Sequence, residues 1–331
     1  MRREPVPNAA PKLMLEAVFV TLEQERVYRN GRQQARVRLD LESTRGGIPS
    51  DLTPREIESI QLFDYHNTAT ETIPFSEDGS VTYQGWSAQH VYRGYAPHPD
   101  TRDRPRARQT FFLYLTANAG AVEPLDVSFV LQGDDLSIWR TNGKVTMLGV
   151  DQRLEAMDKK VDITMTPIAP VTYPANAFLL DRRPLPRSGS TGEAEKATGI
   201  FDDIVTISIM LADQTKLGIR DMQCDPAGMV HWINKLPGTR NPCFTGYAQP
   251  GETTIHWNES MDGHLGSVAL PELPGPETDL GVIVLCGRVD IPTWTGAPEA
   301  PVHVTMTDAY GSTQTCHIGF VVGERDELIV T

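Results

Sequence analysis

Two histidines and two acidic residues lie within nine positions of one another in the second half of the chain. His256, Glu259, Asp262 and His264 carry imidazole and carboxylate groups, which are common ligands of Zn²⁺. A helical zinc site needs two histidines four positions apart with a glutamate beside the first, whereas these histidines are eight positions apart and Gly263 interrupts the segment. On a hairpin they could approach each other. We therefore expect either a metal site at these four residues or a polar hairpin without metal.

Other acidic residues could serve a hydrolase or bind calcium. A glycosidase needs two carboxyl groups facing each other about 5–10 Å apart, and the candidates are Glu252, Glu259, Asp262 and Asp290. Asp134 and Asp135, together with Asp126, could hold calcium, although the alternating pattern of a dedicated calcium loop is missing and a plain turn is favoured. The chain lacks a nucleophile elbow, a phosphate-binding loop and a dinucleotide-binding glycine motif. These patterns favour a protein without catalytic activity, and a hydrolase with an unrecognised site is the third alternative.

Four aromatic residues lie within thirteen positions in the first half of the chain: Tyr83, Trp86, Tyr92 and Tyr95. Glycine, serine and glutamine residues separate them. Loops with this mixture form adaptable contact surfaces, which serve both protein docking and stacking on sugars. The alternative is that Tyr83 and Trp86 anchor the hydrophobic core. Both interpretations stay open at this point.

The four cysteines are Cys224, Cys243, Cys286 and Cys316, and none forms a C-x-x-C pair. Paired zinc ligands are therefore not expected. Cys286 and Cys316 lie in apolar, strand-like runs, which favours free buried thiols. Cys224 and Cys243 flank an expected short helix and could form a disulfide in an oxidising compartment, whereas they would stay reduced elsewhere.

Composition limits the classes of partner. The 331 residues carry a net charge of −13, which opposes binding to nucleic acids and anionic membranes. Arginines are frequent at residues 93–108 and 182–187, but no aromatic residues alternate with them as in a nucleic-acid surface. No apolar run approaches the ~20 residues of a membrane-spanning helix, and the first residues lack the apolar core of a signal peptide. We expect a soluble protein without a cofactor, in a compartment that the sequence does not identify.

Period-two patterns predict β-strands throughout the chain. Ala35, Val37, Leu39 and Leu41 alternate with polar residues, which predicts one buried and one solvated face. Further strands are expected near residues 13–22, 60–63, 80–83, 109–116, 125–131, 136–140, 144–148, 161–166, 204–210, 253–257, 282–289, 302–307, 315–322 and 328–330. The dipeptides Asn30-Gly31 and Asn142-Gly143 indicate tight hairpins.

Only two segments predict helices, and both are short. Thr53-Pro54 and Asp225-Pro226 each combine an N-cap residue with a proline suited to the first turn. Chain length favours two domains. We expect an all-β fold of two antiparallel β-sandwich modules with one or two short helices: an extended arm at residues 1–12, module 1 at 13–180, a polar linker at 181–199 and module 2 at 200–331.

Residues 302–311, VHVTMTDAYG, resemble the strand-and-turn phrase of bacterial immunoglobulin-like repeats, and residues 28–34, YRNGRQQ, are similar to the same phrase. Such repeats occur in adhesins of the invasin type and as modules on phage virion proteins. The resemblance implies an immunoglobulin-like sandwich used for spacing or recognition, with no catalytic residues to carry over.

Together these patterns predict a non-catalytic structural or interaction protein. Its expected partners are other protein subunits of a larger bacterial or phage assembly, either a virion or a secreted appendage. The alternative is an adhesion or glycan-binding protein that uses the aromatic residues between positions 83 and 95. The two differ in partner, since the first binds protein and the second binds sugar.

Overall fold

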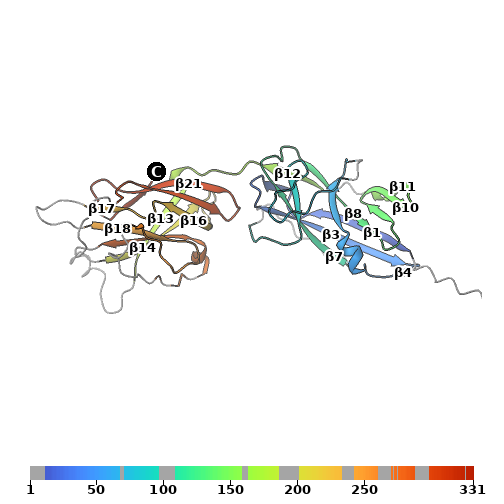
Figure 1. The fold of residues 1–331 in the computed structure, drawn as a ribbon, viewed down its shortest axis with the longest axis horizontal. Helices are drawn as coiled ribbons and strands as arrows, with labels where there is room; N and C mark the ends of the chain where they lie inside the picture. The colour runs from blue at the N-terminus through green and yellow to red at the C-terminus, as the bar shows by residue number, and fades with distance from the viewer. Residues whose placement is uncertain are drawn as a thin grey trace, which may run out of the picture. The chain divides into compact units, whose positions relative to one another are not determined.

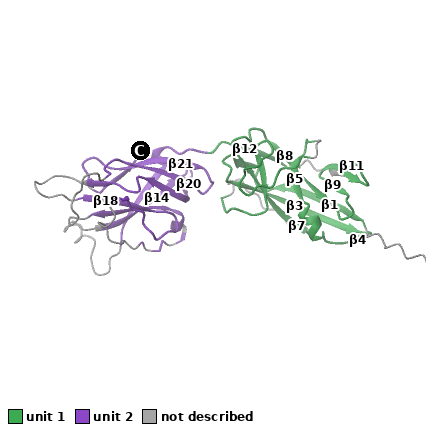
Figure 2. Ribbon diagram, viewed as in Figure 1, with its two compact units in different colours: residues 1–170 green, residues 171–331 purple. Residues whose placement is uncertain are grey.

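The computed structural model describes residues 12–67, 71–96, 109–158, 163–185, 201–232, 242–259, 270, 272–273, 275–287, 298–324 and 326–331. Within them the fold is all-β with one α-helix, which confirms the predicted fold class (Figure 1). The chain divides into two compact units, residues 1–170 and 171–331 (Figure 2).

Two sheets form unit 1. The first has the order β1 (Leu13–Leu22), β3 (Gln34–Arg45), β7 (Gln109–Ala117) and β6 (Trp86–Gln89), with β4 (Ile48–Pro49) paired to β3. The second has the order β11 (Val150–Asp158), β10 (Asn142–Met147), β9 (Ile138–Arg140), β8 (Leu125–Gln132), β12 (Thr164–Ile168) and β2 (Arg26–Tyr28), with β5 (Gln61–Asp64) paired to β8. All pairs are antiparallel except β12 with β2.

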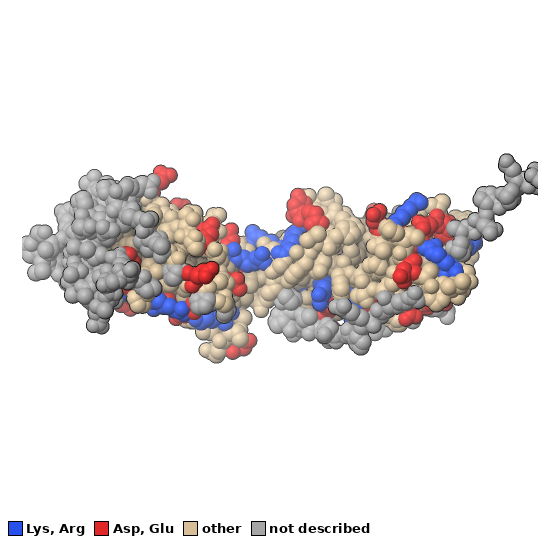
Figure 3. All heavy atoms as spheres, turned by 90° about the horizontal axis from the view of Figure 1, so that it is seen from below, with Lys and Arg blue, Asp and Glu red and all other residues tan. Residues whose placement is uncertain are grey.

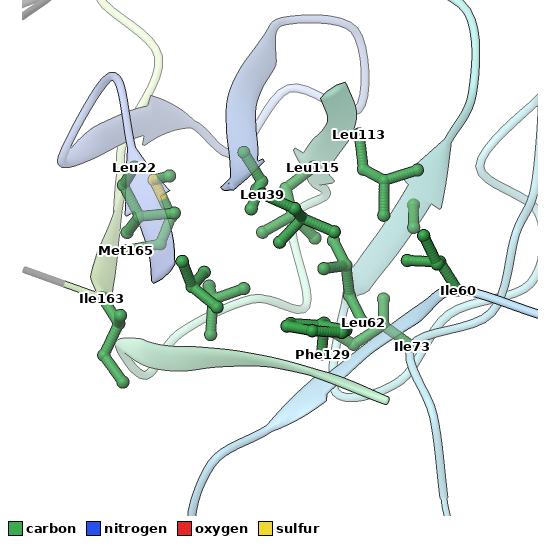
Figure 4. Close-up of a cluster of buried hydrophobic side chains, with 14 of the residues drawn as sticks. Leu22, Leu39, Ile60, Leu62, Ile73, Leu113, Leu115, Phe129, Ile163 and Met165 are labelled. Carbon is green, nitrogen blue, oxygen red and sulfur yellow. The ribbon is translucent and has the colours of Figure 1, made fainter. Parts of the chain in front are cut away.

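The core of unit 1 contains side chains from both sheets. Leu39 and Leu115 of the first sheet and Leu62 and Phe129 of the second have no exposed surface, and they belong to one hydrophobic cluster (Figure 4). A single cluster shared by two sheets is typical of a sandwich.

The polar face of β3 differs from the prediction. Arg38 and Asp40 are only 3 % and 8 % exposed. Arg38 Nε donates to Asp40 Oδ1 over 3.0 Å, and Thr110 Oγ1 donates to the same oxygen. The period-two pattern correctly separates apolar from polar residues. However, the polar face was expected to be solvated, and this part of it is buried.

The predicted helix at Thr53 is confirmed as α1 (Pro54–Glu58). Thr53 accepts a hydrogen bond from Glu56 N, and the Glu56 side chain accepts one from Thr53 N, so the two residues form a capping box. Glu56 is fully buried; it also pairs with Arg45 and accepts from Asp134 N.

Two sheets also form unit 2. The first has the order β13 (Phe178–Pro184), β14 (Phe201–Met210), β19 (Gly281–Gly287), β18 (Pro242–Ala248) and β17 (Val230–Trp232), with β15 (Lys216–Leu217) paired to β14. The second has the order β16 (Ile219–Asp225), β20 (Val302–Asp308), β21 (Thr313–Phe320) and β22 (Leu328–Val330). All of these pairs are antiparallel.

Unit 2 has two hydrophobic clusters, one for each face of its first sheet. Val205 and Ile207 pack with Val304 and Ile318 of the second sheet. On the opposite face, Ile204 joins a smaller cluster that Trp257, Leu270 and Leu273 cover. Described residues of β14, β18 and β19 are therefore buried on both faces, which explains the continuous apolar run at residues 282–286 of β19.

The second predicted helix does not form in residues 225–232, the part of it that the structure describes. Asp225 is the last residue of β16 and pairs with His303 of β20, so it cannot cap a helix. Val230 lies in β17 and pairs with Phe244. The local cap signal at Asp225-Pro226 is overridden by strand pairing with distant segments.

The domain boundary also needs correction. The division lies at Pro170/Val171 rather than at residue 180. Residues 181–184, expected to begin the linker, continue β13, where Arg182 pairs with Asp203 and Asp326. The remainder of the expected linker, from residue 186, and the arm at residues 1–11 lie outside the described residues.

Candidate functional site

Residues 91–96 form a surface loop that follows β6, and buried glutamines hold it in place. Gln34 Nε2 donates to Val91 O over 3.0 Å, and the Gln34 side-chain oxygen accepts from Arg93 N. Gln33 Nε2 donates to Ala96 O over 2.9 Å. Both glutamines are 1 % exposed, so residues 91–96, the described part of the connection from β6 to β7, are attached to the start of β3 at their first and last residues.

A third buried glutamine supports this attachment from below. Gln89 is fully buried, and its Oε1 accepts from Gln34 Nε2 at 3.3 Å and Thr116 Oγ1 at 2.7 Å. Its Nε2 donates to Ser76 O at 3.1 Å and Ser87 Oγ at 2.9 Å. An amide side chain has two acceptor and two donor positions, and all four are used here. Fully satisfied buried networks of this kind make their surroundings rigid.

The loop presents apolar surface to solvent. Val91 is 62 % exposed and Tyr92 is 45 % exposed. The Tyr92 ring stacks on Tyr114 with centroids 5.4 Å apart, and its hydroxyl donates to Tyr95 O. A large aromatic ring with few accessible rotamers, held on a rigid support, is well suited to making contacts.

The four aromatic residues of the predicted contact surface do not form one surface. Tyr92 and Tyr95 belong to the loop, whereas Trp86 is 1 % exposed and lies in the core of unit 1. Tyr83 packs partly buried against that core, and its hydroxyl accepts from Asn67 Nδ2 over 3.3 Å. Trp86 is thus unavailable for stacking on a ligand, which corrects its inclusion in the predicted surface.

A tight turn connects Tyr83 to Trp86. Tyr83 and Trp86 exchange backbone hydrogen bonds across Gln84 and Gly85, both of which have positive φ angles. A Cβ atom at Gly85 would lie 2.1 Å from Ala121 N, so only glycine fits. Residues 80–83, expected as a strand, contribute only an isolated bridge at Tyr83.

The sequence did not indicate that Gln33, Gln34 and Gln89 hold the loop in place. Gln34 stands on the polar face of β3 and Gln89 ends β6, fifty-five positions later. Their common feature in the sequence is an amide at a strand end, which also occurs in ordinary solvated strands. Only the pairing of β3, β7 and β6 brings them together.

The predicted metal cluster is only partly within the described residues. His256 is half-buried, and its Nε2 lies 3.1 Å from Glu252 Oε2. Glu259 is exposed, while Asp262 and His264 lie outside the described residues. Among the residues that are described, no group of three or more histidine, cysteine, aspartate or glutamate side chains is arranged to hold a metal ion.

The aspartates considered for calcium are engaged in local hydrogen bonds. Asp135 Oδ1 accepts from Ser137 N over 3.1 Å, and Asp134 Oδ2 accepts from Thr53 Oγ1 over 3.0 Å. Leu136 N donates to Gly133 O. These contacts are those of a turn that connects β8 and β9.

Unit 2 contains a cavity of about 200 Å³ on the outer face of its first sheet. Its lining includes Ile204 and Val282, which are almost fully buried, and the exposed acids Glu252 and Glu272. Of the two glycosidase candidates within the described residues, Glu252 lines the cavity and Glu259 does not, while Asp262 and Asp290 lie outside the described residues. The cavity combines an apolar floor with negative charge.

All four cysteines are free and buried. Cys224 lies in β16 and Cys243 in β18, and both thiols are free, so the Cys224–Cys243 disulfide considered from the sequence is absent. Burial, with a further contribution from the neighbouring Cys316, raises the pKa of Cys224 to about 12. Burial raises the pKa of Cys316 to about 11. Neither thiol has the lowered pKa of a reactive cysteine.

Two surface properties concern possible partners. Within the described part of the chain, no helix has the length and hydropathy needed to span a membrane. On the face drawn in Figure 3, acidic and basic side chains are interspersed rather than gathered in one field of a single sign. Comparison with protein-family models and with curated proteins gave no match to this chain.

Proposed function

We propose that the protein is a non-catalytic structural or interaction protein, a subunit of a larger bacterial or phage assembly such as a virion or a secreted appendage. The observation that carries the proposal is the 91–96 loop. It exposes Val91 and Tyr92 on a backbone that buried glutamines hold at three points.

The physical argument rests on the entropy of association. Binding immobilises loops and side chains, and a loop that is already ordered avoids much of this cost. Tyr92 is further restricted by its ring stack and by its hydroxyl bond to Tyr95. A solvent-exposed valine and tyrosine on such a support provide apolar contact area at a reduced cost in loop entropy. The immunoglobulin-like phrases at residues 28–34 and 302–311 further support a role in spacing or recognition.

Site-specific photo-crosslinking tests the proposal. A photoreactive phenylalanine analogue is placed at Val91, which is 62 % exposed, and a matched control is placed at Ile48 in β4, which is 71 % exposed. In cells that produce the assembly, position 91 should crosslink to another protein subunit much more strongly than position 48. Equal crosslinking at both positions, or none at 91, would contradict the assignment of this loop as a docking surface.

Glycan binding is the alternative use of the same loop, because an exposed tyrosine also stacks on sugars. A glycan array probed with the wild type and with Tyr92→Ala distinguishes the two functions by the binding signal expected from each. An assembly subunit should give no glycan signal with either protein. A signal that is lost in Tyr92→Ala would establish the glycan-binding alternative instead.

A further inference from the structure

Two histidines oppose each other on neighbouring strands of unit 2. His303 of β20 pairs with His317 of β21 in the sheet register, and their ring centroids are 5.0 Å apart. Their strand neighbours Val304 and Cys316 are buried in the core. Because side chains alternate across a strand, the two imidazoles lie on the outer face of the sheet.

The register places these rings as close together as an antiparallel pair allows. His317 exchanges both of its backbone hydrogen bonds with Thr331, each 2.9 Å long. Its backbone groups therefore point away from β20, and His303–His317 is a non-hydrogen-bonded pair. Side chains of such pairs approach more closely than those of hydrogen-bonded pairs.

The geometry suits two ligands of one metal ion. Metal–nitrogen bonds of about 2.0–2.1 Å, at angles between a right angle and the tetrahedral angle, place two ring centres roughly 4.5–5 Å apart. Imidazole nitrogen is a good ligand for Zn²⁺, Cu²⁺ and Ni²⁺. The ring centroids here are 5.0 Å apart with an interplanar angle of 54°, so their separation already matches that of two ligands of one ion.

The surroundings also favour a cation. Asp225 is exposed and lies on β16, the other neighbour of β20, where it pairs with His303 in the sheet register. Thr305 Oγ1 lies 3.5 Å from His303 Nε2. Both histidine-bearing strands are paired along both edges, since β20 lies between β16 and β21, and β21 between β20 and β22. The backbone spacing of the two ligands is therefore fixed before an ion arrives.

We propose that His303 and His317 form a two-ligand site for a divalent transition-metal ion, with water in the remaining coordination positions. Nitrogen ligands bind Cu²⁺ most tightly among the first-row divalent ions, so the expected order of affinity is Cu²⁺ above Ni²⁺ and Zn²⁺. The site lies in unit 2 and is independent of the proposed docking loop, so either can fail without the other.

Isothermal titration of the full chain with Cu²⁺ tests the site directly. Wild type should bind one ion at this pair, and His303→Asn or His317→Asn should each lower its affinity by about 100-fold, because the second ligand then no longer adds to the first. His256→Asn is the matched control, since His256 is a half-buried histidine of unit 2 outside the pair; it should leave the affinity unchanged. Circular dichroism of each variant establishes that the fold is retained.

Nuclear magnetic resonance supplies a second readout. Substoichiometric Cu²⁺ should broaden the ring signals of His303 and His317 before those of the other histidines. No binding by wild type, an affinity in either pair variant equal to that of wild type, or earlier broadening of His256 would each overturn the proposal.

Discussion

Gln89 is the residue on which the candidate loop depends, although it does not touch solvent. Gln89→Leu keeps a similar volume but removes the hydrogen bonds that Gln89 accepts from Thr116 Oγ1 and Gln34 Nε2 and donates to Ser76 O and Ser87 Oγ. Each unsatisfied buried group costs about 1–3 kcal/mol, so we expect a loss of roughly 3 kcal/mol in the free energy of unfolding, measured by urea denaturation. Gln132→Leu, at an exposed position at the end of β8, should change it by less than about 0.5 kcal/mol. Equal effects of both substitutions would contradict this role.

The buried thiols predict a stability loss at alkaline pH. Burial raises the pKa of Cys224 to about 12, above the value of a free thiol. A raised pKa means that its contribution to stability is fully present below about pH 9 and is lost as the pH rises toward 12. We expect the free energy of unfolding of unit 2 to fall over this range, and to fall less in Cys224→Ala. A pH dependence identical in both proteins would be inconsistent with the buried thiol.

Thiol chemistry checks the same environment at neutral pH. Because the pKa values of Cys224 and Cys316 are raised to about 12 and 11, the reactive thiolate is scarce at both positions. A thiol reagent should therefore label the native chain slowly, and it should label all four free cysteines after denaturation. Rapid labelling of Cys224 in the native protein would refute this picture.

At the scale of elements, the β10–β11 hairpin carries a local conflict. Met147 pairs with Val150, so Leu148 and Gly149 form a two-residue turn, and both have positive φ angles, 53° and 77°. Leu148 is 87 % exposed and gains little from burial. Asparagine is favoured at such positions, so Leu148→Asn should raise the free energy of unfolding by about 1 kcal/mol. Chemical denaturation measures this, and a destabilised variant would show that Leu148 has an unrecognised packing role.

Strands with a clear periodicity were predictable, and strands defined by distant packing were not. The expected strand at residues 13–22 coincides with β1. In contrast, β18 begins with Pro242 and contains Gly246, two residues that argue against a strand. The Trp257 ring explains the glycine, because a Cβ atom there would lie 2.5 Å from it. This contact comes from a segment eleven positions further along the chain and has no local signature.

The candidate loop shows the same limit. The composition around Tyr92 and Tyr95 predicted a contact surface that also included Trp86, whereas the structure leaves Tyr92 exposed and buries Trp86 in the core. Gln33 and Gln34 read as ordinary polar residues of a solvated strand. Their roles become visible only when β6 and the following loop are placed beside β3 and β7.

For the whole molecule, the important feature is that each unit has its own core. The clusters of unit 1 and unit 2 share no residue. Trp86 is fully enclosed in the first of them, and replacing a buried aromatic residue with alanine costs about 3–5 kcal/mol. Independent cores imply that such a change in unit 1 leaves the stability of unit 2 unaltered.

The domain boundary provides the strongest test at this scale. A fragment of residues 171–331 contains all of β13, whereas residues 181–331, which begin at the boundary expected from composition, lack Phe178, Leu179 and Leu180. Phe178 is 6 % exposed in the core of unit 2, and all three residues pair with β14. Loss of one such core side chain costs about 3–5 kcal/mol.

We therefore expect the fragment 171–331 to unfold cooperatively on heating and the fragment 181–331 to unfold at a much lower temperature, or not to fold at all. Calorimetry and circular dichroism measure the unfolding temperature and the cooperativity of each fragment. Equal stability of the two fragments would mean that β13 is dispensable and that the boundary belongs at residue 180. Failure of both fragments, with the full chain stable, would show that the unit 2 core is not self-sufficient.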